Sequence, residues 1–144
     1  MNQEKLLAIL RLQKSKSIGD ITAKKLILKV GDEVQIFKEK KTTLKKINGI
    51  RANAIDHLFS EENTGKAESE LEYILANNIS YTYFLDKDFP KHLLNCIDSP
   101  ILLFKDGNLD FSNQRIISIV GTRNMSSYGR DFCTNLIRDI APFN

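Results

Sequence analysis

A short run of apolar, mostly β-branched residues, 116–120, stops at Gly121, and this junction constrains the fold more than any other part of the chain. A brief apolar run that is bounded by glycine is typical of a buried parallel strand. Beyond it, apolar residues recur every four positions, which predicts a helix over 127–141 with a wide buried face. The repeating residues are Tyr128, Phe132, Leu136 and Ile140. We therefore predict a third strand over 116–120, then a tight turn and a helix.

The residues of this predicted turn are of the kinds that bind an anion. Backbone N–H groups at a helix N-terminus lack partners within the helix, and the helix dipole favours negative charge there. An arginine guanidinium can donate two hydrogen bonds to one phosphate. The predicted phosphate-binding residues are Gly121, Thr122, Arg123, Ser126 and Ser127. We expect one of the two serines to cap the helix, and we expect Tyr128 to lie in the core.

Charge is distributed unevenly along a chain of otherwise ordinary composition. Of the 144 residues, 42% are hydrophobic and 27% charged, as in soluble globular proteins. Residues 1–60 contain 13 Lys and Arg against 6 Asp and Glu, a net charge of +7, whereas residues 61–144 contain 8 against 12, a net charge of −4. Single lysines commonly only solvate helix faces, but the difference between the halves favours a polyanionic partner.

The sequence gives little indication of a metal site, a disulfide or a membrane-spanning segment. Cys96, Cys133, His57 and His92 are isolated and fit no metal-ligand spacing. The apolar stretch near the N-terminus is too short to span a bilayer and lacks a cleavage signal. We expect a cytoplasmic protein without a metal, a cofactor or a membrane partner.

The first half of the sequence predicts a series of short helices, and two pairs of these helices have the same residue spacing. Apolar periodicity and breaker residues predict helices over 6–12, 21–28, 34–37, 44–47 and 52–59. Asp20 and Thr43 are candidate N-caps, and Gly31 a helix terminator.

Segments 12–27 and 44–59 both have the spacing of a helix-hairpin-helix motif. Ser17 and Arg51 each replace one of the usual glycines, and a non-glycine residue restricts positive φ in the turn. We interpret both hairpins as mainly structural. The alternative is contact with DNA phosphates, for which the candidate residues are Lys14, Lys16 and Lys24.

The second half reads as an α/β unit. We predict a linker over 60–65, a helix over 66–77, strands over 79–84 and 101–104, and a short helix between these strands. The expected domains are a helical one over 1–62 and an α/β one over 66–144.

Several motifs of the second half follow one another in an order that resembles the DNA processing protein A family (DprA, also called Smf). They are Asn78-Ile-Ser80, Asp88-Phe-Pro90, Asp98-Ser-Pro100, Asp106-Gly107, Ile119-Val-Gly-Thr-Arg123 and Ser127-Tyr-Gly129. The preceding basic helical module fits the same family.

The resemblance implies a fold and a function. The fold is an N-terminal sterile-alpha-motif (SAM)-like domain with degenerate helix-hairpin-helix repeats, followed by a Rossmann-like α/β unit. Here we expect that unit to be truncated, because the sequence stops after one strand and one helix of the family's sheet. The implied function is non-enzymatic: binding single-stranded DNA, protecting incoming strands and loading the RecA recombinase in natural transformation, with a homodimer in the full-length family. Gly121, Thr122 and Arg123 would contact a DNA phosphate.

Two alternatives remain open at the level of sequence. The first is a Rossmann-like nucleotide-binding protein, although Gly121 and Gly129 do not fit the Gly-x-Gly-x-x-Gly spacing. The second is a non-catalytic protein-interaction fragment, which depends on the helical first half. Salt-dependent binding to DNA would favour the DNA-binding interpretation over both.

Overall fold

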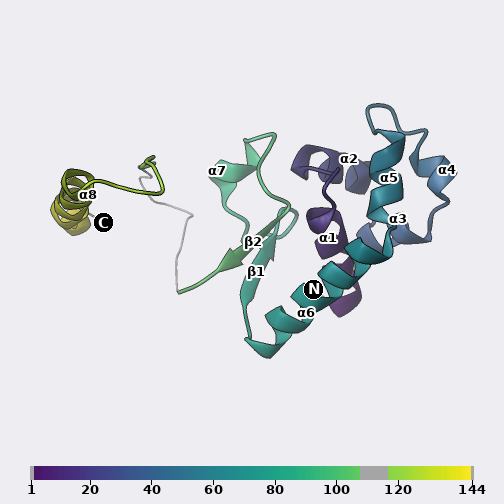
Figure 1. Ribbon diagram of the computed structural model, residues 1–144, viewed down its shortest axis with the longest axis horizontal. Coiled ribbons are helices and arrows are strands. Elements are labelled where there is room, and N and C mark those ends of the chain that lie inside the picture. Colours follow the sequence, from purple (N-terminus) through teal and green to yellow (C-terminus); the bar gives the residue numbers. More distant parts are fainter. Residues whose placement is uncertain (1, 108–116, 144) are drawn as a thin grey trace. The chain divides into compact units, whose positions relative to one another are not determined.

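The structure, a computed structural model, describes residues 2–107 and 117–143, and the chain divides into two units between residues 108 and 109 (Figure 1). The first unit contains α1 (Gln3–Lys14), α2 (Asp20–Val30), α3 (Glu33–Lys38), α4 (Lys41–Leu44), α5 (Ala52–Leu58), α6 (Glu61–Ala76), β1 (Ser80–Tyr83), α7 (Lys91–Leu94) and β2 (Leu102–Lys105). The second contains α8 (Ser127–Ile140) and the 3-10 turn η1 (Ala141–Phe143).

Helices and sheet of the first unit share one core. Helix α6 packs along α1, and α3 contacts both α1 and α2. β1 and β2 are antiparallel, with Ser80 opposite Lys105 and Tyr83 opposite Leu102. Fully buried side chains come from helices and sheet alike: Leu6, Ile9, Leu10, Leu12, Leu26, Ile36, Leu44, Ile55, Leu58, Tyr83, Ile101 and Leu102. The hairpin is therefore part of the same hydrophobic core as α1.

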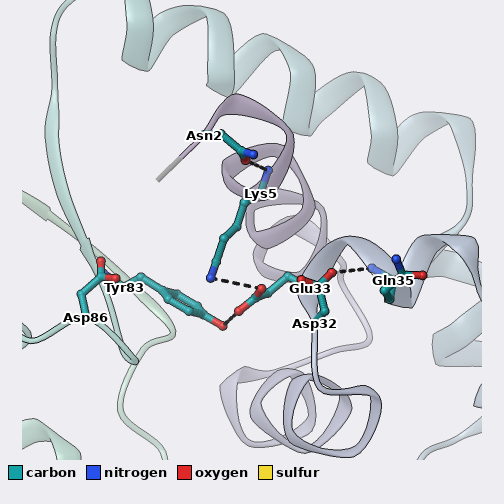
Figure 2. Close-up of polar contacts among 7 residues, drawn as sticks. All are labelled: Asn2, Lys5, Asp32, Glu33, Gln35, Tyr83 and Asp86. Atoms are coloured by element: carbon teal, nitrogen blue, oxygen red, sulfur yellow. Dashed lines mark hydrogen bonds and ion pairs between the residues drawn. The ribbon is translucent and has the colours of Figure 1, made fainter.

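A buried polar cluster joins α1, α3 and β1 within this unit (Figure 2). Glu33 is only 3% exposed, and its carboxylate accepts a hydrogen bond from the Tyr83 hydroxyl. Lys5 Nζ lies 3.3 Å from the other carboxylate oxygen of Glu33 and 5.1 Å from the centre of the Tyr83 ring. Burial and then the bond to Glu33 raise the pKa of Tyr83. The phenol therefore stays protonated and remains a donor to the carboxylate.

The predicted linker over 60–65 is wrong, because α6 begins at Glu61. Ser60 caps this helix, its Oγ accepting a hydrogen bond from Asn63 N at 3.2 Å. Asn63 is 5% exposed, and its Nδ2 donates to Arg11 O at 2.9 Å and to Leu58 O at 3.0 Å. The expected boundary at 62–66 thus falls inside a helix that is tied to α1 and α5, and the division into two domains stays a prediction.

Helix α2 begins one residue earlier than expected. Gly19 is its N-cap, so Asp20 is not, and the Asp20 carboxylate instead accepts a hydrogen bond from Ile101 N at 2.9 Å. Ile21 is 50% exposed, whereas Ala23 is buried. Thr43 is not a cap either, because α4 begins at Lys41. The predicted end of α2 at Gly31 is confirmed, with φ of 89°.

The turns of the two hairpins predicted from sequence are closed by equivalent hydrogen bonds. Ile18 N donates to Ser15 O at 3.2 Å, and Ile50 N donates to Ile47 O at the same distance. Both isoleucines are buried. Gly49 has φ of +77°, whereas Ser17 at the matching position has no positive φ. The expected change of turn geometry at a non-glycine residue is therefore confirmed for the first hairpin.

The predicted third strand is wrong over the described residues 117–120, which have no regular structure; residue 116 lies outside them. Val120 is 93% exposed. An apolar run becomes a buried strand only between other strands, and the strands that the structure describes pair antiparallel with each other. The helix after the turn is confirmed as α8, but none of its described residues is buried, so its expected buried face is also wrong.

Asp88 lies in the connection between β1 and β2 and contacts one residue of each strand. Its carboxylate accepts from Thr82 Oγ1 at 2.8 Å and lies 2.6 Å from Lys105 Nζ. The hydrogen bonds from Lys105 and then Thr82 lower the pKa of Asp88.

We expect this lowered pKa to make the hairpin less stable in acid. The contribution of Asp88 is complete above the unfolded carboxyl pKa of about 3.9 and is lost as the pH falls through the lower folded value. Because the side chain is largely exposed, the loss should stay below about 1 kcal/mol. Urea unfolding at pH 7 and pH 3 checks this, with Asp88→Asn as the variant. An equal loss of stability in both proteins between these pH values would contradict it.

Candidate nucleic-acid interface

The turn before α8 is shaped by two local hydrogen bonds. Ser126 is the N-cap, and its Oγ accepts from Gly129 N at 3.2 Å. Ser127 is the first residue of the helix. Thr122 Oγ1 donates to Asn124 O at 2.8 Å. The expectation that one serine caps the helix is thus confirmed for Ser126, and the hydroxyl proton of Thr122 is already used inside the turn.

Arg123 and Gly121 are open to solvent in this turn. Arg123 is exposed and forms no ion pair with any residue in 2–107 or 117–143. A Cβ added to Gly121 would meet nothing within 4 Å, so the backbone there can be approached closely. Free guanidinium donors and the unpaired N–H groups of the first α8 turn can together hold a phosphate.

Exposed aromatic rings follow the cationic turn, which sequence reasoning missed. Tyr128, the second residue of α8, is 78% exposed and Phe132, one turn later, is 54% exposed. The prediction that Tyr128 lies in the core is therefore wrong. Its four-residue period with Phe132 is that of a core face, and no signal in the sequence separates such a face from an exposed one. Aromatic rings beside a cationic segment are what single-stranded nucleic acids use for base stacking.

The three lysines expected as further DNA contacts belong to the first unit and are engaged within it. Lys14 Nζ lies 3.1 Å from Glu70, and Lys16 Nζ lies 3.3 Å from Glu62. Lys24 Nζ donates to Ser99 Oγ at 2.7 Å and to Ile97 O at 3.3 Å. A contact between these lysines and DNA stays a prediction, and it would compete with internal partners.

Metal-binding clusters and membrane-spanning helices are both absent from the described part of the chain. Among residues 2–107 and 117–143, no three His, Cys, Asp or Glu side chains lie close enough to hold a metal ion. None of the helices that the structure describes combines the length and the apolar character needed to cross a membrane.

Comparison with known proteins gives one family. Residues 80–144 match the model of the family described as DNA recombination-mediator protein A. The match begins at the first residue of β1 and includes the whole turn at 121–127 and α8. No curated protein and no solved structure matches the chain.

Proposed function

We propose that the protein binds single-stranded DNA through the turn before α8, on the premise that the match of residues 80–144 to the DNA recombination-mediator protein A family reflects a shared function. A role in DNA recombination is what the family's description indicates. The proposal adds the ligand, the residues and the mode of contact.

The exposed guanidinium of Arg123 is the observation that carries the proposal. It lies within the matched segment, four residues before the start of α8, and has no ion-pair partner in the described part of the chain. A phosphodiester offers paired oxygens that a guanidinium can contact together. Gly121, Thr122, Ser126 and Ser127 complete the proposed phosphate site, with Ser126 and Thr122 shaping it and the backbone supplying donors.

Exposed rings on α8 support single strands over duplexes. Bases of a single strand are free to stack on Tyr128 and Phe132, whereas in a duplex they are already stacked. We propose further that the protein acts without catalysis, in the cytoplasm, by protecting such strands and passing them to the RecA recombinase, as a homodimer. These finer steps rest on the family resemblance.

Arg123→Gln tests the DNA site. We expect it to weaken binding of a fluorescein-labelled oligo(dT) by about 1–3 kcal/mol, because a charge-assisted phosphate contact is lost. Fluorescence anisotropy at fixed salt measures the change. Arg138→Gln is the matched control: it removes the same charge from α8, the helix that follows the turn, but Arg138 already contacts Asn135 at 2.8 Å and Asp139 at 3.6 Å.

The control should bind DNA like the unaltered protein. If Arg123→Gln also binds like the unaltered protein, the proposed site is wrong. If both arginine variants lose the same affinity, net charge rather than the turn is responsible, and the site again fails.

A further inference from the structure

The basic residues of the first unit separate into two sets. Seven lysines lie within 4.0 Å of a carboxylate: Lys5, Lys14, Lys16, Lys38, Lys45, Lys66 and Lys105. Others form no ion pair with any residue that the structure describes. Apart from Lys24, which donates to Ser99 and Ile97 O, four of these lie on α2 or in the second helical hairpin: Lys25, Lys29, Lys46 and Arg51. The net charge of +7 in residues 1–60 is therefore least compensated in this region.

The fold brings these four residues together around the turn at Gly49. A Cβ on Gly49 would lie 2.5 Å from Lys25 Nζ, so the ammonium of α2 sits directly against the bare backbone of the turn. Lys46 and Arg51 are within three residues of Gly49 along the chain. Lys29 is one helical turn after Lys25, on the same face of α2.

The acidic residues of α2, of the N-cap of α3 and of α5 have other partners. Asp56 of α5 pairs with Lys45, at 2.7 Å. Asp20 of α2 accepts from Ile101 N, and Asp32 caps α3 by accepting from Gln35 N at 2.8 Å. Lys29, Lys46 and Arg51 are exposed, and Lys25 is half-buried. Like charges brought together without counterions are a footprint for a polyanion.

We infer that Lys25, Lys29, Lys46 and Arg51, gathered at the Gly49 turn, form a second DNA-backbone contact, which we call the Gly49 surface. It differs from the lysines expected from sequence, which pair within the protein. Because Gly49 has a positive φ and no side chain, the Lys25 ammonium can lie directly against the turn, beside the other cations, where one phosphodiester backbone can contact them. The inference rests on the proposed function for its choice of DNA among polyanions.

The test compares two triple variants of the full chain that remove the same charge. Lys25→Gln/Lys29→Gln/Arg51→Gln alters the Gly49 surface, and Lys38→Gln/Lys66→Gln/Lys105→Gln alters lysines that are already paired and that were not predicted to contact DNA. Anisotropy with oligo(dT) is measured at several KCl concentrations. We expect the first triple to lower the slope of log K against log salt by about 2, since each single-strand phosphate contact contributes roughly 0.7. Its affinity at low salt should fall at least about tenfold, and the paired-lysine triple should change neither quantity.

Several outcomes would overturn the inference. An unchanged slope in the first triple, or equal losses in both triples, excludes a local contact. Loss of binding to phosphatidylglycerol vesicles instead of DNA would assign the surface to lipid. If the first triple does not fold by circular dichroism, Lys29→Gln/Arg51→Gln replaces it, because both residues are exposed, and a decrease in slope of about 1.4 is then required.

Comparing Arg123→Gln with the first triple distinguishes a failure of the Gly49 surface from a failure of the proposed function. If Arg123→Gln weakens binding while the first triple does not, the Gly49 surface fails and the site before α8 stands. If the unaltered protein does not bind DNA, both fail.

Discussion

Glu33→Ala should lower the free energy of unfolding by about 2–3 kcal/mol, because it leaves a buried phenol without its acceptor. Tyr83 is fully buried and donates its hydroxyl proton to Glu33, as Figure 2 shows. Lys5 also loses its partner at 3.3 Å, but its side chain is 36% exposed and can turn to water. The unsatisfied hydroxyl therefore accounts for most of the expected loss.

A double-mutant cycle isolates this bond. Tyr83→Phe should cost about 1–3 kcal/mol, and the double variant Glu33→Ala/Tyr83→Phe clearly less than the two single losses added together, because neither unpaired group then remains. Urea unfolding followed by far-UV circular dichroism measures all three variants. Glu4→Ala is the matched control, since Glu4 is exposed and its Lys38 partner lies 3.6 Å away. It should change stability by less than about 0.5 kcal/mol. Additive losses in the cycle would rule out direct coupling.

Features set by local chemistry could be predicted from the sequence. The apolar period of α1 and the left-handed ends at Gly31 and Asn78 follow from neighbouring residues alone, and both φ values are positive in the structure. The cap at Ser126 is local in the same way. In each case the residues that decide the structure lie within one helical turn of it.

Features set by distant partners could not be predicted. The start of α6 reads as a polar linker because the group that fixes it, Asn63, bonds to Arg11 O, 52 residues away. Asp20 reads as a cap but binds Ile101 N, 81 residues away. The run at 117–120 has the composition of a buried strand, yet burial requires neighbouring strands that its own sequence does not specify.

The candidate site shows the same division. The order of Gly121, Thr122 and Arg123 before a helix could be predicted, and the structure leaves Arg123 exposed. The sequence could not show which cations of the first half are unpaired, because Lys14 and Lys16 pair with carboxylates on α6. Ion pairing between distant helices depends on packing, which single-sequence patterns do not encode.

Residues beyond 60 contribute a large share of the core around α1. Buried apolar side chains of this cluster that follow residue 60 are Ala67, Ile74, Tyr83, Phe84, Phe89, Ile101 and Leu102. Hydrogen bonds also join these residues to the first 60: Asn63 Nδ2 donates to Arg11 O, Ile101 N donates to Asp20, and Lys24 Nζ donates to Ser99 Oγ. Helix α1 therefore lacks much of its cover when the chain ends before α6.

We therefore expect a fragment of residues 1–60 to lose cooperative folding, while a fragment of residues 1–107 keeps it. Chains of about 60 residues are marginally stable even with a complete core, and burial of each large apolar side chain contributes about 1.5–3 kcal/mol. Losing Tyr83, Ile101 and Leu102 alone removes about 5 kcal/mol or more, comparable to the whole stability of a small domain. Thermal unfolding by circular dichroism should show a sigmoidal transition for 1–107 and a gradual, non-cooperative change for 1–60. A sharp transition for 1–60 at the temperature of the longer fragment would show that the first five helices are independent of α6 and the hairpin, in favour of a domain boundary near residue 62.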